Sequence, residues 1–155
     1  MSCQCSKDYI VDIQILREDA IIPTRGSEKA AGYDLSACLE DPVVIPAGCN
    51  AKIGTGLAIT PPEGYAGWIL PRSGMATKRG LRPSNTPGLC DEDYTGEYIV
   101  SLYNDSDETQ TIYPGDRIAQ LVFLPYINAE FNVVTKLNET ERGDAGFGST
   151  GTATK

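Results

Sequence analysis

The chain has 155 residues, a length that allows one domain with a substantial core and leaves little room for two. Its formal net charge of −8 excludes an ordinary nucleic-acid-binding surface, because phosphate backbones are held by clustered Lys and Arg. Sixteen Gly and ten Pro exclude a helical bundle, since turn residues at this frequency interrupt long helices. The composition therefore favours a single, mainly β domain and still allows a small anionic ligand.

The cysteines and the chain ends give expectations about location. Five cysteines without any histidine fit neither a disulfide framework nor a Cys/His zinc site, so we expect a reducing compartment. Residues 1–8 are expected to be a flexible N-terminal segment without the apolar core of a signal peptide. No run is long enough to span a bilayer. We expect a cytoplasmic protein without a membrane partner, or a nuclear one if its source is eukaryotic or viral.

The predicted strands follow one another at short spacing. The first is residues 9–15, in which Val11, Ile13 and Ile15 alternate with polar residues. Gly and Pro turn signals separate further strands at 31–38, 43–46, 50–60, 65–71, 97–104, 109–113, 117–126 and 130–137. Residues 73–79 alone are expected to be briefly helical. Many short strands without amphipathic helices between them predict an all-β, jelly-roll-like barrel or sandwich.

The strand at 97–104 is apolar on both faces. Tyr98, Val100 and Leu102 occupy one face, and Ile99 and Tyr103 the other. One face has to cover the core, so the other needs a second surface. Association of several copies is the simplest explanation, and we expect an oligomer.

The β domain is expected to cover residues 9–138, and residues 139–155 form a Gly-rich C-terminal arm. Phe147 is the only large apolar side chain after Arg142, so this segment cannot bury enough surface to fold alone. A disordered tail and an arm that closes over a ligand both fit this composition.

Five segments occur in order along the chain: residues 31–37 (AGYDLSA), 71–76 (PRSGMA), 88–97 (GLCDEDYTGE), 115–121 (GDRIAQL) and 142–151 (RGDAGFGSTG). Their order and spacing resemble the five motifs of the trimeric dUTPases. The resemblance implies a jelly-roll homotrimer with active sites at subunit interfaces, which hydrolyses dUTP to dUMP and pyrophosphate with Mg²⁺. Such an activity limits uracil incorporation into DNA and supplies dUMP for thymidylate synthesis.

The resemblance gives Asp91 the role of orienting and deprotonating the water that attacks the α-phosphorus. Read without the motifs, Asp91 is an ordinary turn residue. The base and sugar are expected to meet Asn85, Gly88, Tyr94 and Phe147. In this scheme the Asn85 amide pairs with the uracil edge, Tyr94 packs against the deoxyribose and Phe147 stacks over the base.

The phosphates are expected to contact residues that offer guanidinium, hydroxyl, amide or close backbone groups. These are Arg72, Ser73, Gly74, Gln120, Arg142, Ser149 and Thr150. Two structural alternatives stay open: Ser73 as the N-cap of the short helix, and Gln120 as a core amide satisfied by neighbouring backbone. Asp116 and Arg117 are expected to fix the turn after Pro114 rather than touch substrate.

The metal prediction concerns Asp34, which by resemblance contacts the hydration shell of Mg²⁺ through water. A polar strand residue facing solvent is the alternative interpretation of the same residue.

Two other functions fit parts of this pattern. The dCTP deaminases resemble the same fold, but Asp91 together with the aromatic arm favours phosphate hydrolysis. A non-catalytic protein that uses the nucleotide site as a switch is the alternative from another class.

Overall fold

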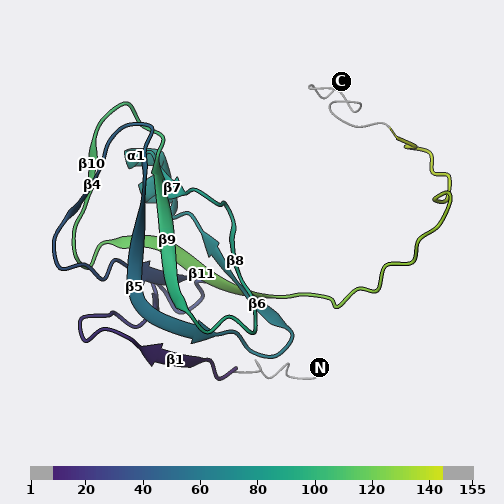
Figure 1. The fold of residues 1–155 in the computed structure, drawn as a ribbon, viewed down its shortest axis with the longest axis horizontal. Helices are drawn as coiled ribbons and strands as arrows, with labels where there is room; N and C mark the ends of the chain where they lie inside the picture. The colour runs from purple at the N-terminus through teal and green to yellow at the C-terminus, as the bar shows by residue number, and fades with distance from the viewer. Residues whose placement is uncertain (1–8, 145–155) are drawn as a thin grey trace.

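The computed structural model describes residues 9–144, which form short strands and one helix around a single core (Figure 1). One sheet contains, in spatial order, β1 (Asp12–Ile15), β5 (Asn50–Thr60), β9 (Glu97–Asn104) and β7 (Leu81–Pro83). The second contains β2 (Thr24–Arg25), β3 (Tyr33–Ser36), β11 (Arg117–Pro125), β6 (Tyr65–Leu70) and β8 (Gly88–Cys90). A ribbon pairs β4 (Val43–Ile45) with β10 (Gln110–Ile112). The predicted all-β, jelly-roll-like class is confirmed.

The two faces of β9 differ as the apolar pattern predicts. Tyr98, Val100 and Leu102 are buried in the core between the sheets, while Ile99 is 47% exposed. Asn104 ends the strand in full burial, where its Nδ2 donates to the carbonyl oxygens of Ile45 (2.9 Å) and Glu108 (2.7 Å). These bonds satisfy the buried amide and tie the four-stranded sheet to the β4–β10 ribbon.

The helix α1 (Ser73–Arg79) has the predicted bounds and begins where β6 ends. Arg72 has an extended backbone (φ −88°, ψ 130°) and is the N-cap, so the alternative in which Ser73 caps the helix is wrong. Gly80 ends the helix with a left-handed φ of 64°, a conformation that glycine adopts without steric cost. Arg72 therefore stands at the junction between β6 and α1.

Residues 130–137 are not a strand, which contradicts the prediction. The chain beyond β11 runs away from the two sheets (Figure 1). Phe131, Val133 and Leu137 are 91%, 94% and 81% exposed. A strand needs a hydrogen-bonded neighbour, and within the described part of the chain this segment pairs with none. The short strands β2, β7 and β8 were not predicted, because two or three residues carry too little pattern.

Candidate active site

A pocket of about 200 Å³ lies where β8 and β7 approach β9. Four predicted site residues line it: Asn85, Gly88, Asp91 and Tyr94. They come from the loop before β8, from β8 itself and from the turn that follows it. We call this hollow the Asp91 pocket, and it brings together the predicted catalytic carboxylate with the residues predicted to hold a base and a sugar.

Gly88 permits the close approach that shapes one wall. It pairs with Ile69 of β6, and a Cβ at Gly88 would lie 3.2 Å from the Ile69 Cβ and 3.4 Å from the Asn85 Nδ2. An added Cβ would therefore crowd the Ile69 side chain and fill the space next to the Asn85 amide. The backbone of β8 and the amide of Asn85 therefore present donors and acceptors side by side, which suits the edge of a planar base.

Tyr94 is held over the chain by local contacts. Its backbone N–H donates to the Asp91 carbonyl (3.1 Å), which closes the turn, and its hydroxyl donates to the Glu97 carbonyl (2.9 Å). A Cβ at Gly96 would lie 2.5 Å from the Tyr94 hydroxyl oxygen, so only glycine leaves room for the ring. The ring is thereby fixed as a wall of the Asp91 pocket.

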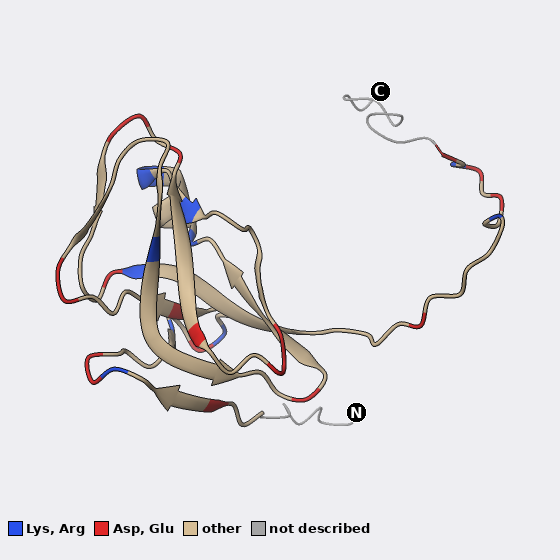
Figure 2. Ribbon diagram, in the orientation of Figure 1, with Lys and Arg blue, Asp and Glu red and all other residues tan. Residues whose placement is uncertain are grey.

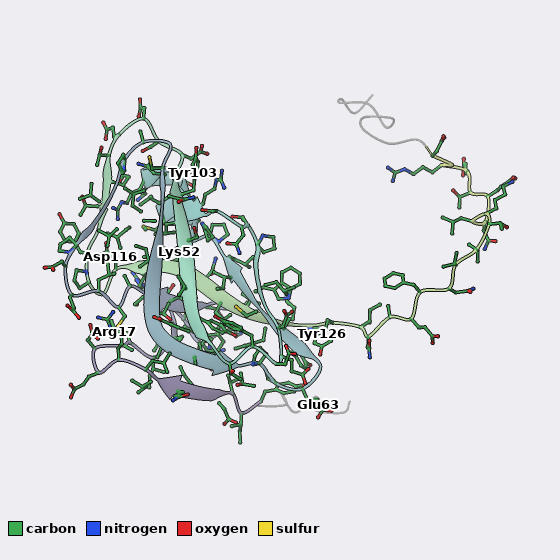
Figure 3. The ribbon with its side chains drawn as sticks, viewed as in Figure 1. Arg17, Lys52, Glu63, Tyr103, Asp116 and Tyr126 are labelled. Atoms are coloured by element: carbon green, nitrogen blue, oxygen red, sulfur yellow. The ribbon has the colours of Figure 1, made fainter. Side chains whose placement is uncertain are left out.

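Glu92 anchors the Asp91 turn to the rest of the molecule. Its Oε2 accepts hydrogen bonds from the Tyr126 hydroxyl (2.6 Å) and the Gly64 backbone N–H (2.8 Å). The Tyr126 hydroxyl, followed by the Gly64 amide, holds the pKa of the Glu92 carboxyl below its ordinary value. Tyr126 lies where the arm leaves the body (Figure 3), so one carboxylate joins the turn to the base of the arm.

Tyr98 and Cys90 form the back of the Asp91 pocket. Tyr98 is 1% exposed, and a Cβ at Gly67 would lie 3.1 Å from its hydroxyl oxygen. Burial raises the pKa of both the Tyr98 hydroxyl and the Cys90 thiol, so both groups are neutral at physiological pH. The sequence pattern identified Tyr98 only as a core residue.

Trp68 borders a second hollow on the other side of the Asp91 turn. It faces Leu89 across β6 and β8, and both line a space of about 560 Å³ together with Asp91, Glu92 and Asp93. The Trp68 Nε1 is buried and makes no hydrogen bond within residues 9–144. The indole is therefore paired with the strand that leads into the Asp91 turn.

The residues predicted to bind phosphate lie elsewhere, on the five-stranded sheet and at the start of α1. Gln120 of β11 stands between Asp34 of β3 and Leu70 of β6 in the sheet register. Its Nε2 donates to the Pro71 carbonyl (2.9 Å), which agrees with the alternative of an amide satisfied by backbone. Gly32 gives the Gln120 side chain its room, because a Cβ there would collide with it.

Asp34 holds two arginines. Its Oδ1 is 2.8 Å from the Arg72 Nε, and its Oδ2 is 3.0 Å from the Arg117 Nη1. The Arg72 Nη1 also donates to the Arg117 carbonyl (3.1 Å). We call these three residues the Asp34 cluster. Ser73 and Gly74 follow Arg72 in the sequence, and both are exposed.

Arg117 departs from its expected role. Asp116 does fix the turn as predicted, since its Oδ2 accepts from the Tyr113 N–H (3.0 Å), but the Arg117 guanidinium reaches Asp34. Figure 2 shows Lys and Arg on α1 and at the start of β11, whereas most Asp and Glu lie in loops. The only sequence signal for this arrangement is the position of Arg117 in the segment that contains Gln120.

The Asp91 pocket and the Asp34 cluster are separate within one chain. None of Asp34, Arg72 and Gln120 lines the Asp91 pocket. Arg142 lies on the extended arm, and the predicted contacts of Phe147, Ser149 and Thr150 fall outside the described residues. One copy of the described residues thus presents the residues predicted to act in catalysis and base binding in one place and those predicted to bind phosphate in another.

The described residues offer little to a directly bound metal. No group of three or more His, Cys, Asp or Glu side chains within residues 9–144 is placed to hold an ion. Both carboxylate oxygens of Asp34 already contact guanidinium groups. A divalent cation at this site therefore needs most of its ligands from a bound phosphate compound and from water.

Cys38, Cys49 and Cys90 are free thiols. Within the described ranges, no helix has the length and apolar character needed to cross a membrane.

Known proteins resemble this chain in both sequence and fold. The family model described as dUTPase matches residues 18–151. The deoxyuridine 5′-triphosphate nucleotidohydrolase of Syntrophotalea carbinolica is 43% identical over 145 residues, which cover 94% of this chain and 99% of the relative.

Solved structures give the same result. A mutant dUTPase of Staphylococcus bacteriophage 80alpha with dUpNHpp superposes with a TM-score of 0.85 at 28% identity, covering 94% of this chain and 100% of the phage chain. A mutant dUTPase from phage phi11 of S. aureus, solved for the coordination of a structural Mg(II) ion, has a TM-score of 0.74 at 27% identity and covers 83% and 98%. The chain belongs to the dUTPase family.

Proposed function

We propose that this chain hydrolyses dUTP to dUMP and pyrophosphate in active sites that combine the Asp91 pocket of one copy with the Asp34 cluster of another. Membership of the dUTPase family supports the reaction. The observation that carries the shared site is the separation of the two residue sets within one chain. A nucleoside triphosphate has its base and its phosphates at opposite ends, so two such surfaces facing each other can hold one substrate.

The Asp91 pocket selects the base and the sugar in this scheme. The Asn85 amide and the β8 backbone pair with the uracil edge, and cytosine would leave buried groups unpaired because its donor and acceptor positions are exchanged. The ring of Tyr94 packs against the deoxyribose, where a 2′-hydroxyl would collide. Both features favour dUTP over dCTP and UTP.

Asp91 supplies the base for the chemical step. It accepts a proton from a water molecule whose oxygen forms a bond to the α-phosphorus, while the bond from that phosphorus to the bridging oxygen breaks. The electron pair leaves with pyrophosphate. The Arg72 guanidinium and the Ser73 hydroxyl offer hydrogen bonds to the oxygen that gains charge.

Mg²⁺ is the metal that we propose for this chain, since the dUTPase family is generally dependent on a divalent metal. When bound, such an ion neutralises part of the triphosphate charge and orients its oxygens. The described residues fit an ion that is held mainly by phosphate oxygens and water. The water-mediated contact of Asp34 stays a prediction, as do the phosphate contacts of Arg142, Ser149 and Thr150 and the stacking of Phe147.

The proposed oligomer is a homotrimer. Ile99 on the outer face of β9 and the exposed side chains of 127–137 present apolar surface that one copy leaves uncovered. Apolar surface that one copy leaves uncovered favours association with another copy. A trimer covers it and completes each site with residues from more than one copy.

The experiment that tests the function mixes purified protein and magnesium with dUTP, dTTP, dCTP or UTP and measures release of pyrophosphate and ammonia. We expect pyrophosphate from dUTP alone and no ammonia from any nucleotide. Ammonia from dCTP would indicate a deaminase. Tight binding of dUTP without turnover would indicate a nucleotide switch.

A further inference from the structure

The Asp34 cluster carries a net positive charge, and a contact between Asp34 and a metal does not explain why two arginines lie there. One carboxylate, whose side chain is only 16% exposed, is bonded through both oxygens to two guanidinium groups. The three charges sum to +1. A group with this net charge attracts an anion such as a phosphate.

The contacts fix the plane of the Arg72 guanidinium. Asp34 accepts from its Nε and the Arg117 carbonyl accepts from its Nη1, which leaves Nη2 as the nitrogen that these contacts do not use. The Gln120 amide is bonded to the carbonyl of Pro71, the residue before Arg72. Asp34 therefore holds the Arg72 side chain in place. The next two residues, Ser73 and Gly74, are exposed, and a Cβ on Gly74 would meet no described atom within 4 Å.

Arg117 reaches the same place from the neighbouring strand. Because β11 and β6 are antiparallel, the start of β11 lies beside the end of β6, and both arginines meet at Asp34. The Arg117 side chain is 57% exposed, so it retains donors for a ligand. An ion pair with one well-exposed partner contributes little to stability, so folding alone does not account for the second arginine, Arg117, on this carboxylate.

We propose that Asp34 is a positioning residue that orients Arg72 and Arg117 toward the β- and γ-phosphates, and that Arg117 is a further phosphate-binding residue. This inference rests on the proposed phosphate role of Arg72. It differs from the water-mediated metal contact in one respect that can be measured. A residue that acts through arginines matters with or without magnesium, whereas a residue that acts through the metal matters only when magnesium is present.

The test uses the full chain and measures binding of dUpNHpp and dUMP by titration calorimetry, in magnesium and in EDTA. The variants are Asp34→Asn and Arg117→Gln, with Lys52→Gln as a control that removes an exposed charge from β5 in the other sheet. Arg117→Lys keeps the charge and loses the planar fork. Thermal unfolding of each variant verifies its fold.

We expect Asp34→Asn and Arg117→Gln each to weaken dUpNHpp binding about tenfold, by a similar factor in both media, since a charge-assisted bond to phosphate is lost. Binding of dUMP should change less, because dUMP lacks the β- and γ-phosphates. Arg117→Lys should restore part of the affinity, and Lys52→Gln should bind like the wild type.

A loss in Asp34→Asn that appears only with magnesium would overturn the proposal in favour of the metal contact. Unchanged dUpNHpp binding in Arg117→Gln would overturn the role of Arg117. If the wild-type chain bound no dUpNHpp in either medium, the proposed function itself would fail.

Discussion

Asp91 and Asp93 lie in the same turn, but Asp91 lines the small pocket beside Asn85 and Tyr94 and Asp93 does not. The two carboxylates therefore provide a matched pair. We predict that Asp91→Asn slows pyrophosphate release from dUTP by about a hundredfold or more, because the amide cannot accept a proton from water. Binding of dUpNHpp should be retained. Asp93→Asn is the control and should keep near wild-type turnover, and undiminished turnover in Asp91→Asn would reject Asp91 as the base.

A substitution at Gly96 tests whether the Tyr94 ring recognises the deoxyribose. A Cβ at this position would collide with the Tyr94 ring, so Gly96→Ala should displace Tyr94 from the pocket. We predict a lower kcat/KM for dUTP and a smaller preference for dUTP over UTP, both measured from initial rates. The control is Gly26→Ala, since a Cβ at Gly26 would meet no described atom within 4 Å. A preference that survives Gly96→Ala unchanged would remove Tyr94 from sugar recognition.

At the scale of the elements, the hydrogen bonds of Glu92 in the Asp91 turn make the stability of the fold depend on pH. The bonds from Tyr126 and Gly64 depress the folded-state pKa of Glu92 below its ordinary value of 4.5, so they stabilise the fold above that pH. The contribution is lost as pH falls through the depressed folded pKa, where the folded carboxylate takes up a proton.

We therefore predict that Glu92→Gln lowers the Tm at pH 7 and that the difference from wild type shrinks in acid. Thermal unfolding between pH 7 and pH 3 measures it. The exposed neighbour Glu63 provides a control in Glu63→Gln, which should track the wild type. A difference in Tm that stays constant across this range would show that Glu92 does not act through its charge.

How far the sequence predicts these elements depends on where their partners lie. The strand 97–104 and the helix 73–79 have the predicted bounds, because alternation and a glycine stop are local signals. The segment 130–137 was also expected to be a strand, but it pairs with no strand among residues 9–144. Local pattern cannot say whether the missing partner belongs to the same copy, and this is the physical reason for the error.

The candidate site also has one part that the sequence predicts and one part that only the fold reveals. The family resemblance identifies Asn85, Asp91 and Tyr94, and the fold brings these residues into one pocket. The association of Asp34 with Arg117 depends on the pairing of β3 with β11, which joins residues 83 positions apart. No spacing rule reports a contact at that separation, so Arg117 was expected only to shape a turn.

At the scale of the whole molecule, a site shared between copies has a measurable signature. Asp91→Asn removes the proposed base from the Asp91 pocket, and Arg72→Gln removes a proposed phosphate-binding group from the Asp34 cluster. Each variant alone should therefore be nearly inactive. We predict that oligomers reassembled from an equal mixture regain activity in about one quarter of their sites, since random assembly pairs two intact halves at that frequency. Pyrophosphate release after joint refolding measures the recovery.

The control for this mixture combines Asp91→Asn with a second lesion in the same pocket, Tyr94→Ala. No arrangement of those two chains unites intact halves, so no recovery is expected. If Asp91→Asn and Arg72→Gln also failed to complement each other, each active site would have to be built from a single copy.

Trp68 has a consequence for spectroscopy. It is the only tryptophan in 155 residues, and it faces Leu89 beside the hollow that Asp91 and Glu92 line. Emission excited at the red edge of the absorption band therefore comes from one chromophore next to the catalytic turn. The protein thus contains its own optical reporter, and a spectral shift on adding nucleotide can be assigned to that turn without an attached dye.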